Sequence, residues 1–396
     1  MANSNLTNAK NAKNDEFYTQ YHDIEKEINA YLDYNEDLFK GKTILLPCDD
    51  PEWSNFTKFF AQNFERLGLR ELISTSYAQE SKKYKSKYQP TLFELNDPQF
   101  DEDKSIKNGK IFKLSHDKSG DGRIDVNDLE WEYLEGDGDF KSNEIRNLRD
   151  KADFIITNPP FSLFREFLEW VKEAQKQFVI IGSMNAITYK EVFPLIKENK
   201  VWLGATGNGS DMVFAVPKGA SVAEKDKQKA AKLGYVGSYT RLGNSCWFTN
   251  IDHGRRHQPL ALMNEHDIIK FGSKKPFEHY DNYEAIEVPT VKFIPNDYEG
   301  VMGVPISFLD KYSPEQFEIV GLTSGRDEFE CRPSKKYKNP KQHNPNGLIG
   351  NGSKANTRAT LRLRETPSDI YYTADNADGP LAIVYARILI QHKRSK

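Results

Sequence analysis

Apolar positions near the start of the chain follow two different periods. Ile24, Ile28 and Tyr31 recur at steps of three and four residues, which predicts a helix over 22–34. The unbroken apolar run 43–47 (TILLP) that follows is typical of a strand buried on both faces. The chain therefore begins with a helix that leads into a buried strand.

The next apolar positions return to helical spacing. Ser54 is a suitable N-cap, five Phe or Leu residues then recur on one face, and Gly68 supplies a stop signal. A second strand is expected over 69–77. The order strand, turn, helix, strand opens a doubly wound α/β domain.

The same alternation resumes after residue 150. Further strands are expected at 152–157 (ADFIIT), 178–182, 201–203, 212–216 and 245–250, and further helices at 163–174 and 189–200. Beyond about residue 253 the helical spacing fades and Pro, Tyr and charged residues dominate. We therefore expect a disordered N-terminus over 1–13, an α/β domain over 14–252 and a smaller, irregular region over 253–396.

Residues 80–135 interrupt the α/β rhythm and are interpreted as an inserted hairpin region. Within it, Asp117–Asp128 places Asp, Ser and Gly at several positions of a calcium-binding EF-hand-like loop. Position 12 is Asp instead of Glu, and the preceding residues 109–115 alternate like a strand. A hairpin turn built from Asp and Gly is therefore favoured, with calcium binding left open.

Composition narrows the class of protein. The chain of 396 residues has a net charge of −3, no apolar run of membrane-spanning length and a polar N-terminus without a signal sequence. The cysteines Cys48, Cys246 and Cys331 are scattered and form no CxxC pair, which argues against a zinc knuckle or a disulfide framework. We expect a cytoplasmic, monomeric protein with no membrane partner and no metal.

One segment departs from this balanced charge. Between Cys331 and Arg364 there is no acidic residue, and nine are basic: Arg332, Lys335, Lys336, Lys338, Lys341, Lys354, Arg358, Arg362 and Arg364. Asn, Gly and Pro are frequent there, so the segment is interpreted as a set of loops. It is either a solvated insertion or a DNA-contacting surface, with Lys335, Lys336, Lys338, Lys341 and Arg358 as the candidate contacts.

The candidate chemistry lies directly after strand 152–157, in the turn Asn158-Pro159-Pro160-Phe161. Ligands of open α/β sheets bind at the carboxyl ends of the strands. An exocyclic amino group is a poor nucleophile because its lone pair is delocalised into the ring. The Asn158 side-chain oxygen and the Pro159 carbonyl can accept both of its N–H bonds, and two prolines hold these acceptors in place. Phe161 offers an aromatic face on which a base can stack.

The turn limits the substrate to an sp² carbon that bears NH₂, which includes adenine N6, cytosine N4 and a glutamine side chain. Asn158 is an orienting acceptor and not a general base, because an amide does not take up a proton as a carboxylate does. A simple proline turn is the structural alternative, but the flanking strand and helix argue against it.

The chain also resembles the EcoRI modification methylase family of adenine-specific DNA methyltransferases. The likeness covers most of the chain. It rests on the stretches 15–20 (DEFYTQ), 48–51 (CDDP), 54–56 (SNF), 136–140 (GDGDF), 157–167 (TNPPFSLFREF), 187–192 (ITYKEV), 202–204 (WLG), 300–309 (GVMGVPISFL) and 387–390 (RILI). The resemblance implies an S-adenosylmethionine-dependent enzyme that methylates adenine N6 in double-stranded DNA. It also implies a Rossmann-like methyltransferase sheet with helices on both faces and a C-terminal target-recognition region.

The resemblance further implies roles for individual residues. The cofactor-binding candidates are Phe17, Tyr18, Thr19, Asp49, Asp50, Asn55, Asp137, Asp139, Phe140 and Asn158. The catalytic candidates are Asn158, Pro159, Pro160 and Phe161. Phe17–Thr19 is expected near the methionine end of the cofactor, Asp49 and Asp50 near its ammonium or ribose, and Asp139 and Phe140 near its adenine.

Two features of the sequence differ from the pattern of methyltransferases in general. The first strand is not followed by a Gly-x-Gly turn, and the second strand does not end in an acid that could bind the ribose. Asp49 and Asp50 therefore have an alternative role as caps of the following helix. Asp137 and Asp139, which lie between glycines, have an alternative role in an ordinary turn.

Other functions remain as alternatives. A protein-glutamine methyltransferase uses a similar Asn-Pro-Pro turn, but Phe161 and the basic segment favour DNA. A combined restriction and methylation protein would need a cleavage motif and a further domain, and neither is evident in the sequence. A non-catalytic DNA- or calcium-binding module built around Asp117–Asp128 would leave the α/β region unexplained.

Overall fold

The structure is a computed structural model that describes residues 17–49, 54–78, 98–208, 212–216, 222–273, 275–323 and 331–393. Asp50 and the expected disordered segment 1–13 lie outside these residues. The chain divides into two compact units. Unit 1 comprises 1–184 and 202–254, and unit 2 comprises 185–201 and 255–396. Residues 185–201, which the sequence placed in the α/β domain, thus pack within unit 2.

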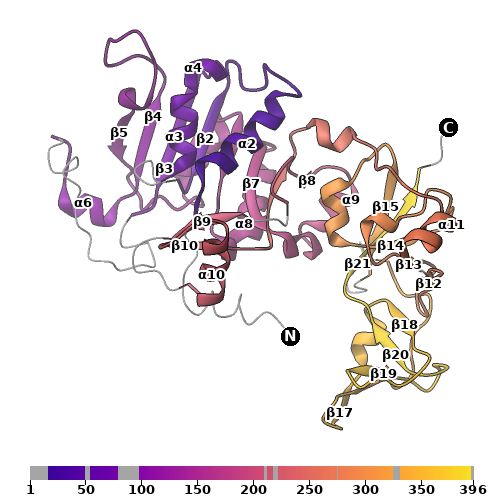
Figure 1. Ribbon diagram of the computed structural model, residues 1–396. Helices are drawn as coiled ribbons and strands as arrows, with labels where there is room; N and C mark the ends of the chain where they lie inside the picture. The colour runs from indigo at the N-terminus through magenta and orange to yellow at the C-terminus, as the bar shows by residue number, and fades with distance from the viewer. Residues whose placement is uncertain are drawn as a thin grey trace. The chain divides into compact units, whose positions relative to one another are not determined.

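Unit 1 is built on an eight-stranded mixed sheet (Figure 1). In spatial order its strands are β5 (Glu130–Tyr133), β4 (Lys110–Leu114), β3 (Glu71–Ser76), β2 (Thr43–Pro47), β6 (Phe154–Thr157), β7 (Gln177–Ser183), β11 (Ser245–Thr249) and β8 (Trp202–Leu203). The four central strands β3, β2, β6 and β7 run parallel, and the other pairings are antiparallel. The predicted α/β class is confirmed, and the buried strand predicted at 43–47 forms over those residues.

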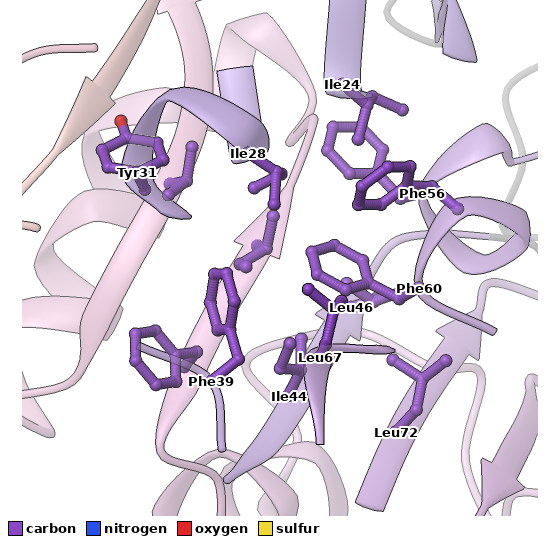
Figure 2. Close-up of a cluster of buried hydrophobic side chains, with 14 of the residues drawn as sticks. Ile24, Ile28, Tyr31, Phe39, Ile44, Leu46, Phe56, Phe60, Leu67 and Leu72 are labelled. Carbon is purple, nitrogen blue, oxygen red and sulfur yellow. The ribbon is translucent and has the colours of Figure 1, made fainter. Parts of the chain in front are cut away.

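One face of this sheet is covered by α2 (Tyr21–Leu32), α3 (Asn55–Gln62) and α4 (Phe64–Leu67). Figure 2 shows their apolar side chains gathered with those of β2 and β3 in one buried cluster. Phe56, Phe59 and Phe60 are almost completely buried there. Each such ring contributes about 2 kcal/mol by leaving water, so the helical spacing read from the sequence marks a large part of the core.

Helix α8 (Phe164–Glu173) covers the other face of the sheet. The Phe164 ring packs against Phe248 of β11 with 5.0 Å between ring centroids. Phe164 also fills the space that a side chain at Gly182 of β7 would need. Within the described part of unit 1, the chain also forms α6 (Glu102–Lys107), α7 (Asn143–Lys151) and α10 (Glu224–Lys232).

A separate three-stranded sheet lies beside the main one in unit 1. It consists of β1 (Tyr18–Thr19), β9 (Val213–Ala215) and β10 (Tyr239–Arg241), with β9 in the middle. Thr19 and Thr240 stand directly opposite Phe214 of β9, one on each side. The strand expected over 212–216 thus forms in this small sheet, where it fixes the position of residues 18 and 19.

The insertion contains the hairpin β4–β5, which extends the main sheet. In the connecting loop, Asp117 accepts hydrogen bonds from the backbone N–H groups of Gly120 and Gly122. Asp128 accepts them from Lys118, Ser119 and Asp125. Asp117 and Asp128 thus hold together the long loop that joins the two strands.

Two predicted helices are shorter than the sequence indicated. The helix after Ser54 is interrupted at Asn63, which separates α3 from α4, and it ends at Gly68 with a left-handed φ of 62°. The helix predicted over 189–200 is reduced to α9 (Phe193–Lys197). Pro194 explains this, because proline is tolerated only in the first turn of a helix and so fixes where the helix begins.

Unit 2 is more regular than expected. One five-stranded sheet contains, in spatial order, β12 (Glu278–His279), β13 (Ile286–Glu287), β14 (Met302–Pro305), β21 (Arg387–His392) and β15 (Phe317–Leu322). A second contains β17 (Ile349–Asn351), β16 (Lys341–His343), β19 (Tyr371–Thr373), β20 (Leu381–Ile383) and β18 (Thr360–Arg362). The α-helices among the described residues of unit 2 are α9 and α11 (Glu265–Ile268). No strand was predicted in this region, because strands this short produce no clear alternation in the sequence.

No helix within the described ranges combines the length and the apolar character needed to cross a membrane.

Candidate active site

The residues predicted to carry the chemistry gather at one edge of the main sheet. Because β2, β3 and β6 are parallel, their carboxyl ends meet at that edge. Asp49 follows β2, Tyr77 follows β3, and Asn158 follows β6 directly. Residues from three distant parts of the sequence are thereby brought together.

Asn158 is held in place through the nitrogen of its side-chain amide. Its Nδ2 donates a 2.6 Å hydrogen bond to the backbone oxygen of Phe17. Its Oδ1 is buried and has no hydrogen-bond partner among the described residues. A buried acceptor without a partner costs about 1–3 kcal/mol. The amide is therefore held through its nitrogen, and its oxygen is left without a donor among the described residues.

The turn after Asn158 continues directly into helix. Pro159 is buried, and the Pro160 carbonyl accepts from the N–H of Leu163, which closes a short 3-10 turn over Phe161–Leu163 before α8. The prolines fix φ on both sides of their shared peptide bond. The turn is thus a rigid connection between a buried strand and an amphipathic helix, as the sequence predicted.

An aromatic cluster lies next to this turn. The Phe161 ring meets Phe17 edge-on at 5.9 Å and Phe214 at 6.4 Å between centroids. Phe17 and Phe214 are also in edge contact, at 6.1 Å. Phe161 is only partly buried. The sequence did not assign Phe214, whose position in the middle strand of the small sheet depends on pairing that spans nearly 200 residues.

The predicted cofactor segment Phe17–Thr19 is fixed from two sides. Tyr18 and Thr19 pair with β9, and Asn55 Nδ2 donates a 2.7 Å hydrogen bond to the Thr19 backbone oxygen. The Thr19 side chain is 2% exposed, and its hydroxyl has no hydrogen-bond partner among the described residues. The segment whose Phe17 oxygen binds the Asn158 amide therefore also offers a buried polar atom without a partner among the described residues.

Asp49 is buried and engages two hydroxyl groups. Ser54 Oγ donates to Asp49 Oδ1 at 2.7 Å, and Thr157 Oγ1 lies 2.6 Å from Asp49 Oδ2. Ser54 Oγ also accepts from the N–H of Phe56 and so caps α3, as predicted. Cys48, which precedes Asp49, has a left-handed φ of 72°, a conformation that costs a non-glycine residue about 1–2 kcal/mol. Asp49 therefore supports the helix cap without being the cap.

The predicted cofactor turn 137–140 is internally bonded. Asp137 Oδ1 accepts from the N–H of Asp139, and Asp139 Oδ1 accepts from the N–H of Lys141. The Phe140 ring is 1% exposed and packs against Phe167 and Trp170. The side chain of Phe140 is therefore part of the core, and the turn can offer a ligand its backbone and its carboxylates.

Tyr77 takes the position after β3, where no acid follows the strand. Its hydroxyl lies 3.7 Å from Cys48 Sγ. Burial raises the pKa of Tyr77 well above its usual range, and Cys48 and Asp139 raise it further. Tyr77 thus remains a neutral hydroxyl at this edge. Tyr77 was not predicted from the sequence, because the residue expected to bind a ribose after the second strand is an acid.

A buried acid in α2 was also missed. Glu27 is 0% exposed and accepts hydrogen bonds from Tyr31 Oη and from the N–H groups of Ala205 and Thr206. Burial raises the pKa of Glu27, and these hydrogen bonds oppose that shift. Glu27 lies on the apolar face that Ile24 and Ile28 define, which was the available signal. It holds the loop after β8 in place.

The five candidate DNA contacts occupy different environments in unit 2. Lys335 Nζ forms a 2.9 Å ion pair with Asp281, which also pairs with Arg362. Lys336, Lys338 and Lys341 are exposed. Arg358 lies over the ring of Tyr385, which is 60% exposed. The acid-free segment therefore obtains part of its charge balance from residues outside it, and Lys335 has a structural partner.

Part of this segment forms a hairpin between β16 and β17, which we call the 341–351 hairpin. Its turn is closed by hydrogen bonds between the backbones of Asn344 and Leu348 and between Gly347 and Asn344. Leu348 and Ile349 are 65% and 62% exposed. The prediction of loops was thus wrong here, because these residues form two strands at the edge of the second sheet of unit 2, joined by an apolar, exposed tip.

No group of three or more His, Cys, Asp or Glu residues suited to hold a metal ion occurs within the described part of the chain.

Comparison with known proteins agrees with this geometry. Residues 5–393 match the family described as Adenine-specific methyltransferase EcoRI. The Type II methyltransferase M.EcoRI of Escherichia coli is 41% identical over 82% of this chain and 91% of its own length. M.MpnI of Mycoplasma pneumoniae is 33% identical over 79% of this chain and 83% of its own. M.MgeORF184P of Mycoplasma genitalium is 32% identical over 79% and 84%. No solved structure gives a significant match.

These matches decide between the alternatives left open by the sequence. The family and the named relatives are DNA methyltransferases, which argues against a protein-glutamine methyltransferase and against a module without catalysis. The chain belongs to the EcoRI family of adenine-specific methyltransferases and is an adenine-specific DNA methyltransferase.

Proposed function

We propose that this enzyme transfers a methyl group from S-adenosylmethionine to N6 of an adenine flipped out of double-stranded DNA, at a specific site. The observation that carries the proposal is the Asn158 amide, whose nitrogen is bonded to Phe17 and whose buried Oδ1 has no partner within the described residues. An adenine amino group could donate a hydrogen bond to this oxygen.

The chemistry follows from that acceptor. With one N–H bonded to Asn158 Oδ1 and the other to the Pro159 carbonyl, the amino nitrogen is drawn toward tetrahedral geometry, and its lone pair becomes available for attack. Both acceptors belong to a rigid turn, so little reorganisation is needed during the reaction. Phe161 would stack on the flipped base. The nucleotide must leave the duplex, which costs a few kcal/mol.

The carboxyl edge of the sheet also fits the proposed cofactor. S-adenosylmethionine carries a methyl group that its sulfonium already activates, so no metal is required. The residues proposed to hold it are the segment Phe17–Thr19, which contains the buried Thr19 hydroxyl without a partner among the described residues, and the turn with Asp137 and Asp139. The four parallel strands support a Rossmann-like assignment of the fold.

Unit 2 is proposed to recognise the target sequence. The exposed Lys336, Lys338 and Lys341 would meet phosphates. The 341–351 hairpin forms the edge of its sheet, and its tip is proposed to reach the major groove with Leu348 and Ile349 as apolar contacts to base edges. Lys335 is proposed instead to stabilise unit 2 through Asp281. Each protein molecule is proposed to act as a monomer.

The test is methyl transfer by the purified protein. It would be incubated with S-adenosylmethionine labelled in the methyl group and with unmodified plasmid DNA, and the DNA would then be digested to nucleosides. The proposal predicts label in N6-methyldeoxyadenosine. Label in N4-methyldeoxycytidine, or in protein instead of DNA, would contradict it.

A further inference from the structure

Four side-chain hydrogen bonds join the active-site segments into a closed ring. Asn158 Nδ2 donates to Phe17 O, and Asn55 Nδ2 donates to Thr19 O. Ser54 Oγ donates to Asp49 Oδ1, and Thr157 Oγ1 lies 2.6 Å from Asp49 Oδ2.

Short stretches of backbone complete the ring. Thr157 is followed by Asn158, Ser54 is followed by Asn55, and Phe17 is joined to Thr19 through Tyr18. The ring thus runs from the catalytic turn through β1, α3 and the end of β2, and returns to the catalytic turn. We call it the Asp49 ring.

Burial makes this ring stiff. Ser54, Asp49 and Thr157 are 3%, 5% and 0% exposed, so water does not compete for their hydrogen bonds. Both oxygens of the Asp49 carboxylate are bonded to hydroxyl groups, and removing either hydroxyl would leave a buried carboxylate oxygen without that donor. The single hydrogen of the Thr157 hydroxyl is shared between Asp49 Oδ2 and Pro47 O, each 2.6 Å away, so Thr157 is joined both to the last residue of β2 and to Asp49.

We infer that Asp49, Asn55 and Thr157 are positioning residues that fix the Asn158 amide through this ring. The inference rests on the proposed role of Asn158 and changes the roles that family resemblance implied for Asp49 and Asn55. Neither side chain is required to touch the cofactor. Each holds a segment that does: Asn55 holds the Phe17–Thr19 segment, and Asp49 joins the end of β2 to the residue before Asn158.

The ring also couples the two substrates. A ligand that shifts the Phe17–Thr19 segment moves the backbone oxygen that Asn158 Nδ2 binds, and so moves Oδ1. Binding at the cofactor side is thereby transmitted to the acceptor for the adenine amino group. A displacement near 1 Å at a reacting centre is enough to lower a rate by roughly a hundredfold.

The decisive variant is Thr157→Val, which keeps the shape of the side chain and removes its hydroxyl. The ring predicts that kcat falls roughly a hundredfold, while KM for S-adenosylmethionine and for DNA changes by no more than about threefold, because the binding groups remain. Thr157→Ser restores the hydroxyl and is expected to restore most of kcat. The inference would be overturned if Thr157→Ser lost as much kcat as Thr157→Val. It would also be overturned if Thr157→Val raised KM and left kcat unchanged.

Thr249→Val is the matched control for fold stability. Thr249 is fully buried in β11 and donates a 2.7 Å hydrogen bond to Phe178 O, but it lies outside the ring. Thermal unfolding should shift downward in both valine variants, and further in Thr157→Val because its partner is a carboxylate. At temperatures where both variants are folded, only Thr157→Val should lower kcat. Equal losses of kcat in both variants would show that the ring residues act only through the stability of the core, which would contradict the inference.

A double variant tests whether the ring acts as one unit. Asn55→Ala opens the ring at the other side of Asn158, so the loss of kcat in the Thr157→Val and Asn55→Ala double variant should be close to that of the worse single variant. If the fold-loss of kcat in the double variant equalled the product of the two single-variant losses, the two residues would act independently, which would contradict the inference. If Asn55 binds the cofactor directly, Asn55→Ala would raise KM for S-adenosylmethionine, which would also contradict it.

Failure of this inference is distinct from failure of the proposed function. If Asn158→Ala abolishes methyl transfer and Thr157→Val does not affect it, only the ring is refuted. If Asn158→Ala turns over normally, the proposed role of Asn158 itself is wrong.

Discussion

The two units place their functional side chains in opposite environments. At the carboxyl edge of unit 1, Asn158 and Asp49 are held by hydrogen bonds from distant segments, and water is largely excluded. In unit 2, the proposed DNA contacts Lys336, Lys338 and Lys341 are exposed to solvent. The first arrangement suits a reaction that depends on fixed geometry, and the second suits a long, charged partner.

We therefore expect the two sites to respond to different perturbations. Buried, bonded groups gain from low dielectric surroundings and are insensitive to salt, whereas exposed lysines interact with phosphates through a field that salt screens. Unit 2 also shows that a basic segment is not uniform. Lys335 and Arg362 bond to Asp281 and contribute to the fold.

The largest effect is expected at Asn158. Asn158→Ala removes the acceptor and should lower the rate of methyl transfer in a single turnover by about 10²–10³-fold, while calorimetric titration shows S-adenosylmethionine bound with little change in affinity. Asn158→Asp keeps an acceptor but loses the donor to Phe17 O, and so should fall between Asn158→Ala and the unmodified enzyme. If Asn158→Ala turned over at close to the normal rate, the assignment of the chemistry to a buried, fixed site in unit 1 would be wrong.

Asp281 is expected to give the next largest effect, on stability instead of rate. Burial alone would raise the pKa of Asp281, but hydrogen bonds from Lys335, Tyr337 and Arg362 outweigh it and lower the pKa to about 2. Its ordinary pKa is about 3.9, so the lowered value corresponds to about 2 kcal/mol of stability.

Because the folded-state pKa is lowered, this contribution is fully present above about pH 4 and is lost as the pH falls toward 2. Denaturant unfolding should therefore show Asp281→Asn less stable than the unmodified chain at pH 7, with the gap closing in acid. A gap that stays constant down to pH 2 would contradict the ion-pair assignment.

The exposed lysines should affect DNA affinity and its dependence on salt. Replacing Lys336, Lys338 and Lys341 by Ala should reduce the slope of log K against log salt by up to about 0.9 for each phosphate that is no longer neutralised. Lys335→Ala is the matched control, because Lys335 is already paired with Asp281. Fluorescence anisotropy at several salt concentrations measures the DNA affinity of each variant and the slope of that affinity against salt. Equal slopes in the triple variant and the unmodified enzyme would identify these lysines as a solvated surface.

The smallest effect is expected at the tip of the 341–351 hairpin. Leu348→Ala with Ile349→Ala should weaken binding to the preferred site by several-fold and leave the salt slope unchanged, because apolar contacts to base edges release no counterions. Val236→Ala, at a residue of unit 1 that is 79% exposed, is the matched control. A changed salt slope, or the same weakening in the control, would argue against entry of the hairpin into the groove.

The contrast between the units also shows what the sequence could predict. The turn at Asn158 was predictable because its strand, its prolines and its following helix are contiguous, so local physics fixes its geometry. The role of Ser54 as a helix cap was predictable for the same reason. The contacts of Asp49 were not, since its partner Thr157 lies 108 residues away and only the sheet order brings the two together.

Unit 2 was harder to predict because its strands are only two to six residues long. Such strands show little alternation, and the abundance of Gly, Asn and Pro between them resembles loop composition. The basic charge was visible in the sequence, but the partner of Lys335 was not, because Asp281 lies outside the acid-free segment.

The most direct test of the division between the two units is a base-resolution methylation map of DNA from cells that express the enzyme. The account predicts N6-methyladenine at one short sequence for the unmodified enzyme, almost none for Asn158→Ala, and a relaxed or weakened sequence preference for the Leu348→Ala and Ile349→Ala variant. Methylation of another base, or full methylation by Asn158→Ala, would contradict the assignment of the chemistry to the Asn158 turn.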